Sequence, residues 1–240
     1  MLKLLRNCIS TLKIIQYEGK NIEWYFLEEL EKFQRELGFK FANKIDGQHI
    51  FFQNLKMKVK LAAQLLSSKV ADALEFLMES GHPKFQGAEA TIKFIRVTDR
   101  LFDLLNSRNV CGKGYKMPLR RETKDVWMNV IQDTETYLLK LEYAGRPLVK
   151  HRKGFFITGF IFCLHSCSQL AQELLFDLPN PLDYILMYKT SQDHEEIYFG
   201  QLRQGCGANT NLDLFEIKHR LKRQFLKNSI IASNNGNCDI

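Results

Sequence analysis

This chain lacks a cysteine metal motif and a disulfide framework. The six cysteines are scattered through 240 residues, and no Cys-x-x-Cys pair occurs. Cys163 and Cys167 flank a histidine, but no second ligand pair lies at the spacing that zinc requires. Cysteines in an apolar helix are more often buried thiols than metal ligands. The pattern argues against a zinc site and indicates reduced thiols, which suit the nucleus or cytosol.

Other signatures are also absent. No Gly-x-x-x-x-Gly-Lys-Ser/Thr loop occurs, so any nucleotide site must differ from a P-loop. The N-terminus is charged and only weakly apolar, unlike a secretory signal. The most apolar run, residues 155–164, has about half the length of a membrane span, so it predicts a core helix and no membrane partner. Alternating apolar and polar residues are rare, which predicts few strands.

The chain does contain an excess of basic residues. Its formal net charge is +7, and its hydrophobic content of 45% is ordinary for a globular protein with an ample core. The basic residues gather in three segments, at 113–121, 150–153 and 218–227. Since such segments neutralise phosphates, we expect weak, sequence-independent DNA binding through them. A solvated helix face would have the same composition.

Apolar residues recur at helical spacing along most of the chain. This spacing predicts helices over residues 1–16, 21–37, 55–78, 88–107, 125–143, 155–176, 193–201 and 212–226. Gly38 follows the second helix, as expected for a C-terminal glycine. The asparagine-rich end predicts a disordered tail over residues 227–240. The predicted fold is therefore mainly α.

The most informative segment is residues 191–200, Ser-Gln-Asp-His-Glu-Glu-Ile-Tyr-Phe-Gly. Carboxylates beside apolar residues are costly unless they pair, bind a metal or bind a polar ligand. Asp193 and Glu196 are three residues apart, so they share one face of a helix. Carboxylate oxygens on one face suit Mg²⁺. An acidic first helical turn capped by Ser191 has the same composition, so the chemistry alone leaves both interpretations open.

The order of residues in this segment resembles the Gln-Asp-x-x-Glu-x-x-Phe-Gly segment of P-element-type transposases, which include the THAP-domain transposases of animals. Other stretches resemble the family in the same order. They lie at residues 1–7, 42–45 with His49, 56–64, 101–108 and 158–160. The ordered agreement extends over nearly the whole chain, from residue 1 to about residue 225.

This resemblance implies a helical GTP-binding insertion domain inserted in an incomplete RNase H-like domain. Residues 1–37 then form the end of the first RNase H-like half, and residues 38–182 form the insertion. Residues 183–226 form the closing RNase H-like segment, and residues 227–240 the tail. The few expected strands belong to the RNase H-like part.

The resemblance also implies a metal ligand. Glu196 matches the third carboxylate of the family's Asp-Asp-Glu triad, which holds two Mg²⁺ ions that activate the nucleophile and stabilise the leaving oxygen. The adjacent Glu195 stands where family members often have an apolar residue. Glu196 is therefore the expected catalytic and metal-binding residue.

A GTP site is implied by five further positions. Asp193 and Asp103 match acidic positions that read the guanine edge, where a carboxylate can accept hydrogen bonds from N1 and N2. Lys44, Lys58 and Val59 match positions that contact the phosphates and the nucleotide. An exposed helix acid and a solvated lysine face are the alternative interpretations for Asp103 and the lysines.

The family's first two catalytic aspartates lie upstream of the segment that residues 1–7 match, as does its zinc-coordinating THAP module. We therefore expect a truncated or domesticated P-element-type transposase fragment that binds GTP and keeps one catalytic carboxylate. The parental reaction is metal-dependent DNA cleavage and strand transfer, and the chain alone is expected to be inactive. It is expected to be nuclear, with homo-oligomerisation confined to a full-length parent. The alternative is a catalytically dead module that binds DNA or protein.

Overall fold

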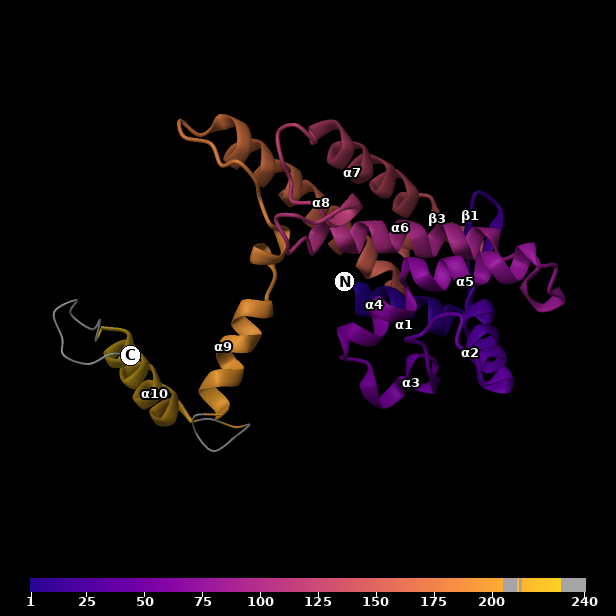
Figure 1. The fold of residues 1–240 in the computed structure, drawn as a ribbon, viewed down its shortest axis with the longest axis horizontal. Coiled ribbons are helices and arrows are strands. Elements are labelled where there is room, and N and C mark those ends of the chain that lie inside the picture. The colour runs from indigo at the N-terminus through magenta and orange to yellow at the C-terminus, as the bar shows by residue number, and fades with distance from the viewer. Residues whose placement is uncertain (205–210, 212, 230–240) are drawn as a thin grey trace. The chain divides into compact units, whose positions relative to one another are not determined.

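The computed structural model describes residues 1–204, 211 and 213–229 (Figure 1). The chain divides into two units, Met1–Tyr188 and the segment that begins at Lys189. The helices of the first unit are α1 Leu2–Leu12, α2 Tyr25–Leu37, α3 Gly47–Ile50, α4 Val59–Leu65, α5 Ser68–Glu79, α6 Glu89–Leu105, α7 Lys124–Leu139 and α8 Phe155–Gln172. The second unit contains α9 Asp193–Gln204 and α10 Leu214–Ser229. The prediction of a mainly α fold with few strands is confirmed.

One small antiparallel sheet lies in the first unit, with the strand order β2-β1-β3-β4. Its strands are β1 Ile14–Tyr17, β2 Lys20–Glu23, β3 Leu141–Tyr143 and β4 Arg146–Pro147. The sheet therefore joins two hairpins that are more than a hundred residues apart in sequence, and so fixes the N-terminal part of the chain to the region after α7.

Two-residue turns explain why these segments are hairpins and not helix ends. Glu18 and Gly19 have φ values of 48° and 77°, and Ala144 and Gly145 have 50° and 72°. Two successive positive φ values are the geometry of the tight turns that match strand twist. The predicted helices over 1–16, 21–37 and 125–143 are therefore wrong at those ends, where the chain turns into strands.

The predicted helix over residues 55–78 is interrupted. Leu66 leaves the helical region at φ −100° and ψ 33°, and the following Ser67 is extended, so α4 ends and α5 begins in a new direction. The Ser67 hydroxyl donates to the Gln64 carbonyl at 2.8 Å and stabilises the break. Both helices bury their apolar stripe in the core, which is why the spacing looks continuous in the sequence.

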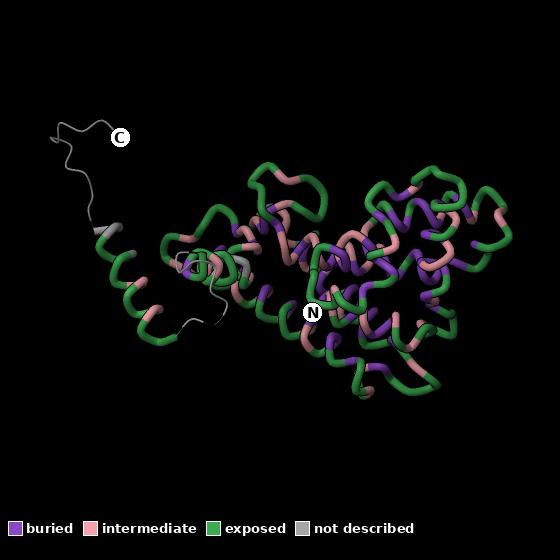
Figure 2. The backbone as a smooth tube through the Cα atoms, turned by 90° about the horizontal axis from the view of Figure 1, so that it is seen from below, coloured by how far each residue is buried: buried purple, intermediate pink, exposed green. Residues whose placement is uncertain are grey.

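The core of the first unit is built around α6 (Figures 1 and 2). This helix packs against α5, α7 and β2, while α8 packs against α7 and α1. Fully enclosed side chains such as Leu5, Phe94 and Phe156 belong to this core. Each such side chain contributes about 1.5–3 kcal/mol when it leaves water. This packing fixes the positions of α1, α4 and α6, which carry Arg6, Val59 and Asp103.

The segment Arg152–Asp177, which contains α8, is long and apolar enough to cross a membrane by length and composition alone. In the first unit, however, Phe156, Ile157 and Phe160 of α8 are buried against the neighbouring helices. The same helix buries Cys167, and burial raises the pKa of this thiol to about 12. Cys163 is exposed, contrary to the prediction that both thiols are buried.

The remaining predicted helices agree with the structure to within a few residues. Gly38 ends α2 in the left-handed conformation at φ 65°, as the sequence predicted. The helix α10 continues to Ser229, and the rest of the predicted tail, residues 230–240, lies outside the described residues.

Candidate functional site

Two of the predicted nucleotide contacts, Lys44 and Lys58, lie on the segment between α2 and α4, which we call the 42–59 segment. It contains only the short helix α3 and the 3₁₀ turn Gln53–Leu55. Both lysine side chains are exposed, and neither forms an ion pair with another described residue. Val59, the first residue of α4, is 42% exposed. The segment therefore presents two unpaired cations and an accessible apolar side chain.

Buried side chains fix the start of the 42–59 segment. The Ala42 amide donates to Gln34 Oε1 of α2 at 2.6 Å in the core. Ala42 and Ile45 are almost fully enclosed. Lys44 thus lies between two buried positions on a well-anchored stretch of backbone.

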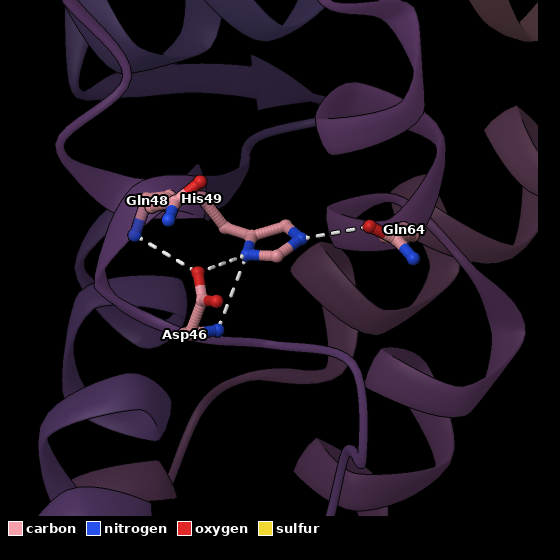
Figure 3. A network of polar contacts seen from close by, with 4 residues as sticks. All are labelled: Asp46, Gln48, His49 and Gln64. Atoms are coloured by element: carbon pink, nitrogen blue, oxygen red, sulfur yellow. Dashed lines mark hydrogen bonds and ion pairs between the residues drawn. The ribbon is translucent and has the colours of Figure 1, made fainter. Parts of the chain in front are cut away.

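A polar network around His49 joins α3 to α4 (Figure 3). The Asp46 amide donates to His49 Nδ1 at 3.1 Å, and Asp46 Oδ1 lies 2.8 Å from the same nitrogen. The other ring nitrogen, Nε2, lies 3.1 Å from Gln64 Oε1 on α4. Because the imidazole is almost fully buried, it links α3 to α4 inside the protein.

The Asp46 carboxylate also caps α3. Its Oδ1 accepts a hydrogen bond from the Gln48 amide at 2.9 Å. Burial alone would raise the pKa of Asp46, but the contacts with His49 and the Gln48 amide outweigh it, so the pKa is lowered. The carboxylate is therefore stabilised in its charged form.

Asp103 lies near the C-terminal end of α6, and its side chain is only 19% exposed. Burial raises its pKa, the nearby Asp99 raises it further, and Lys116 partly offsets both from 3.7 Å. Lys116 is the one cation close to this largely enclosed carboxylate among the described residues, so the carboxylate oxygens can accept further hydrogen bonds. The position therefore suits recognition of a donor group.

The C-terminal end of α6 is tied to the last residues of the first unit. Ser107 is fully buried, and its hydroxyl accepts a hydrogen bond from the Met187 amide at 3.1 Å. Its carbonyl accepts another from the Tyr188 amide at 3.2 Å. The chain therefore leaves the first unit next to the element that carries Asp103, a few residues before Asp193.

The acidic segment forms the start of α9 in the second unit. Asp193 is its first residue, and its side chain lies outside the described part of the structure. Glu195 and Glu196 are both exposed, and the Glu196 amide donates to the Gln192 carbonyl at 2.9 Å. Among the described residues, no group of three or more His, Cys, Asp or Glu side chains could hold a metal ion.

The predicted site residues are divided between the two units. Lys44, Lys58, Val59 and Asp103 all belong to the first unit, whereas Asp193 and Glu196 belong to the second. No hydrogen bond or ion pair joins Asp103 to Lys44 or Lys58 within the described ranges.

A cavity of about 580 Å³ lies between α6 and α7. Its lining includes Lys93 and Arg100 of α6, together with Tyr17, Tyr115 and Tyr137. None of the predicted nucleotide contacts lines it. No sequence pattern indicates this cavity, because its lining comes from four separate parts of the chain.

The predicted basic segments are largely exposed. In α10, Lys218, Lys222 and Arg223 are exposed. Lys150, Arg152 and Lys153 are exposed in the turn before α8. These side chains can reach a polyanion in solvent.

Two family models match the chain. The TNP-like, GTP-binding insertion domain matches residues 1–118, and the TNP-like, RNase H C-terminal domain matches residues 188–211. The first range contains Lys44, Lys58, Val59 and Asp103, and the second contains Asp193 and Glu196.

Similar proteins agree with these models. The chain is 34% identical to the DNA transposase THAP9 of Homo sapiens over 85% of this chain and 23% of the relative. It is 25% identical to the Transposable element P transposase of Drosophila melanogaster over 94% of this chain and 29% of the relative. It thus spans about a quarter of the length of these relatives.

A solved structure shares the fold. The Drosophila P element transposase strand transfer complex superposes with a TM-score of 0.80 at 23% identity, over 94% of this chain and 49% of that chain. Taken with the two domain models and the two relatives, this places the chain, with its GTP-binding insertion and RNase H C-terminal segments, in the P-element-type transposase family.

Proposed function

We propose that this transposase-derived protein binds GTP, with four of the five predicted contacts in its first unit and Asp193 in the second. The observation that carries the proposal is the match of the GTP-binding insertion domain to residues 1–118, which include four of the five predicted contacts. In this proposal Lys44 and Lys58 bind the phosphates, and Val59 contacts the nucleotide. Neither lysine has an acidic partner among the described residues, so both are available to an anion.

Asp103 and Asp193 are proposed to read the guanine base. The enclosed Asp103 carboxylate supports this role because it has one cation at 3.7 Å and spare acceptor capacity. Adenine presents an acceptor where guanine presents the N1 donor, so carboxylates at these positions favour GTP over ATP.

The proposed context is DNA transposition in the nucleus. The named relatives are transposases, and the basic segments of this chain support weak DNA binding. Homo-oligomerisation is proposed as a property of transposases that contain these two domains. A catalytically dead module that binds DNA or protein is the alternative to a transposition role.

Glu196 is proposed as a Mg²⁺ ligand for metal-dependent DNA cleavage and strand transfer. An exposed carboxylate suits this ion. The described residues supply no group of three ligands, however, so no cleavage step is assigned to this chain.

Calorimetry with GTP and ATP tests the nucleotide proposal. We expect GTP to bind at least tenfold more tightly, since an unmatched polar edge costs about 1–3 kcal/mol. Lys58→Met should weaken GTP and ATP alike, because it removes a phosphate contact. Equal affinity of the unmodified protein for both nucleotides would remove the guanine-reading role.

Asp193→Asn tests the base contact directly. The amide presents a donor where the carboxylate presented an acceptor, so GTP should bind about tenfold more weakly. Xanthosine triphosphate, whose edge presents an acceptor at the corresponding position, should gain affinity for the variant. A parallel loss for both nucleotides would contradict the proposed contact.

A further inference from the structure

Arg6 of α1 is a charged side chain enclosed in the protein without a carboxylate beside it. None of its surface is exposed. The guanidinium carbon lies 3.8 Å from the centroid of the Phe52 ring, and Nη2 donates to the Lys56 carbonyl at 2.8 Å. Asn7 Oδ1 accepts hydrogen bonds from Nη2 at 3.1 Å and from Nε at 3.3 Å.

This arrangement is unfavourable for stability alone. The Nη1 atom is buried and has no hydrogen-bond partner in the described part of the chain. No described acid forms an ion pair with Arg6, and burial lowers the pKa of its guanidinium. An unpaired buried charge is costly, and an apolar side chain of similar volume would avoid that cost.

The contacts of Arg6 converge on the end of the 42–59 segment. Phe52 and Lys56 lie on either side of the 3₁₀ turn Gln53–Leu55. Directly after this turn, the Lys58 amide donates to the Leu55 carbonyl at 3.0 Å, and α4 begins at Val59. The guanidinium therefore contacts both sides of the turn that leads into the predicted phosphate-binding residues.

Phe52 and Leu55 anchor the turn by apolar packing in the core, but the turn has few hydrogen bonds to hold its backbone. Its own backbone supplies the Leu55-to-Phe52 and Lys58-to-Leu55 hydrogen bonds, at 2.7 Å and 3.0 Å. Three-residue turns of this kind have weak hydrogen-bond geometry and are easily distorted. Arg6 adds the link from another helix, fifty residues away in sequence.

We infer that Arg6 is a positioning residue of the nucleotide site, which holds the Lys56 carbonyl so that Lys58 and Val59 are presented to the ligand. This inference rests on the proposed GTP-binding function. Because Arg6 is fully enclosed, it acts through the turn and does not touch the nucleotide. The cost of burying its charge is then offset at the site by a preordered phosphate contact.

Arg6→Met in the full chain tests this role. Methionine keeps the volume and the contact with Phe52 but cannot donate to Lys56. We expect a folded protein whose GTP affinity is about tenfold lower and whose amides at residues 56–61 exchange faster with solvent. Arg96→Met is the matched control, since Arg96 of α6 pairs with Glu75 at 3.0 Å and is not a predicted contact. The control should leave both readouts unchanged.

A double-mutant cycle separates positioning from general destabilisation. If Arg6 acts through Lys58, Arg6→Met should cost little further affinity in a Lys58→Met background. In an Asp103→Asn background the two losses should add, because Asp103 lies on a different element. The same tenfold loss in both backgrounds would overturn the inference.

Failure of the inference and failure of the proposed function give different results. If the unmodified protein binds no guanine nucleotide, the proposed function fails, and hydrogen exchange still decides what Arg6 does. Unchanged exchange at residues 56–61 in Arg6→Met would show that Arg6 does not hold the turn. Unchanged GTP affinity in a binding-competent background would also overturn the positioning role.

Discussion

At the scale of single residues, Asp46 has two roles in the 42–59 segment. It caps α3 through the Gln48 amide and lies 2.8 Å from His49 Nδ1. Both contacts favour the charged carboxylate and lower its pKa below the ordinary value of 3.8. A group with a lowered folded-state pKa stabilises the protein above its ordinary pKa, and that contribution is lost as the pH falls through the lowered value.

Asp46→Ala should therefore destabilise the protein in a pH-dependent way. Loss of the cap should cost about 1 kcal/mol at pH 7. The difference from the unmodified protein should shrink as the pH falls below about 4. Urea unfolding from pH 7 to pH 3 measures it, and Asp46→Asn, which keeps an acceptor for the Gln48 amide but has no charge, should recover only part of the loss at pH 7. A difference that does not depend on pH would contradict the role of the charge.

At this scale the sequence predicted the candidate site residues, but it did not predict the side chains that hold them in place. His49 belongs to a stretch that resembles the family, yet its link to Gln64 depends on how α3 meets α4. Arg6 contacts a carbonyl fifty residues away, and neither spacing nor charge pattern reports such a contact. Residue roles at the site itself, including Glu196 and Asp193, remain predictions.

At the scale of elements, periodicity predicted where helices lie better than where they end. The apolar stripe over residues 55–78 is continuous because α4 and α5 bury the same face, and only the backbone at Leu66 and Ser67 reveals the break. The hairpins were missed because strands of two to four residues are too short for an alternating pattern. Gly19 and Gly145 were the only available signal, since glycine favours the second position of such turns, whereas Glu18 and Ala144 are not residues that usually adopt positive φ at the first position.

The helix α10 provides a prediction about DNA. Lys218 and Lys222 are four residues apart and therefore lie on one face, and the neighbouring Arg223 is also exposed. Each phosphate that these side chains neutralise should add about 0.9 to the slope of log affinity against log salt on duplex DNA. Replacing all three by Gln should weaken binding at low salt and reduce this slope. Fluorescence anisotropy with a labelled duplex of arbitrary sequence measures both effects.

A control with equal net charge separates a local role from the overall charge. Lys20, Lys32 and Lys69 are exposed and lie outside the three basic segments. Their replacement by Gln should change binding much less than the α10 variant. Equal effects of the two triple variants would show that net charge, and not α10, governs the interaction.

At the scale of the whole molecule, the two matched domains are divided between the two units. The first unit, Met1–Tyr188, carries the match to the GTP-binding insertion domain, and the match to the RNase H C-terminal domain begins at residue 188. Fold class and family were predictable because helical spacing and ordered motifs extend along the entire chain. The domain boundaries at residues 37, 182 and 226 remain predictions, because composition changes little at those points.

Nucleotide binding should also be visible in the stability of the whole molecule. A ligand that binds only the folded state stabilises it by about 2.7 kcal/mol at one hundred times its dissociation constant. For a protein of this size, this stabilisation corresponds to an increase in Tm of roughly 5–10 °C. GTP should therefore raise the Tm well above the value reached with the same concentration of ATP, as measured by differential scanning calorimetry.

The Lys58→Met variant supplies the control for this thermal shift. Lys58 is exposed and unpaired among the described residues, so its replacement should leave the Tm without nucleotide nearly unchanged. The increase caused by GTP should be smaller at equal concentration, because weaker binding contributes less to the folded state. Equal increases with GTP and ATP, or an undiminished increase in the variant, would mean that the nucleotide stabilises the protein from a site other than the one that Lys58 helps to form.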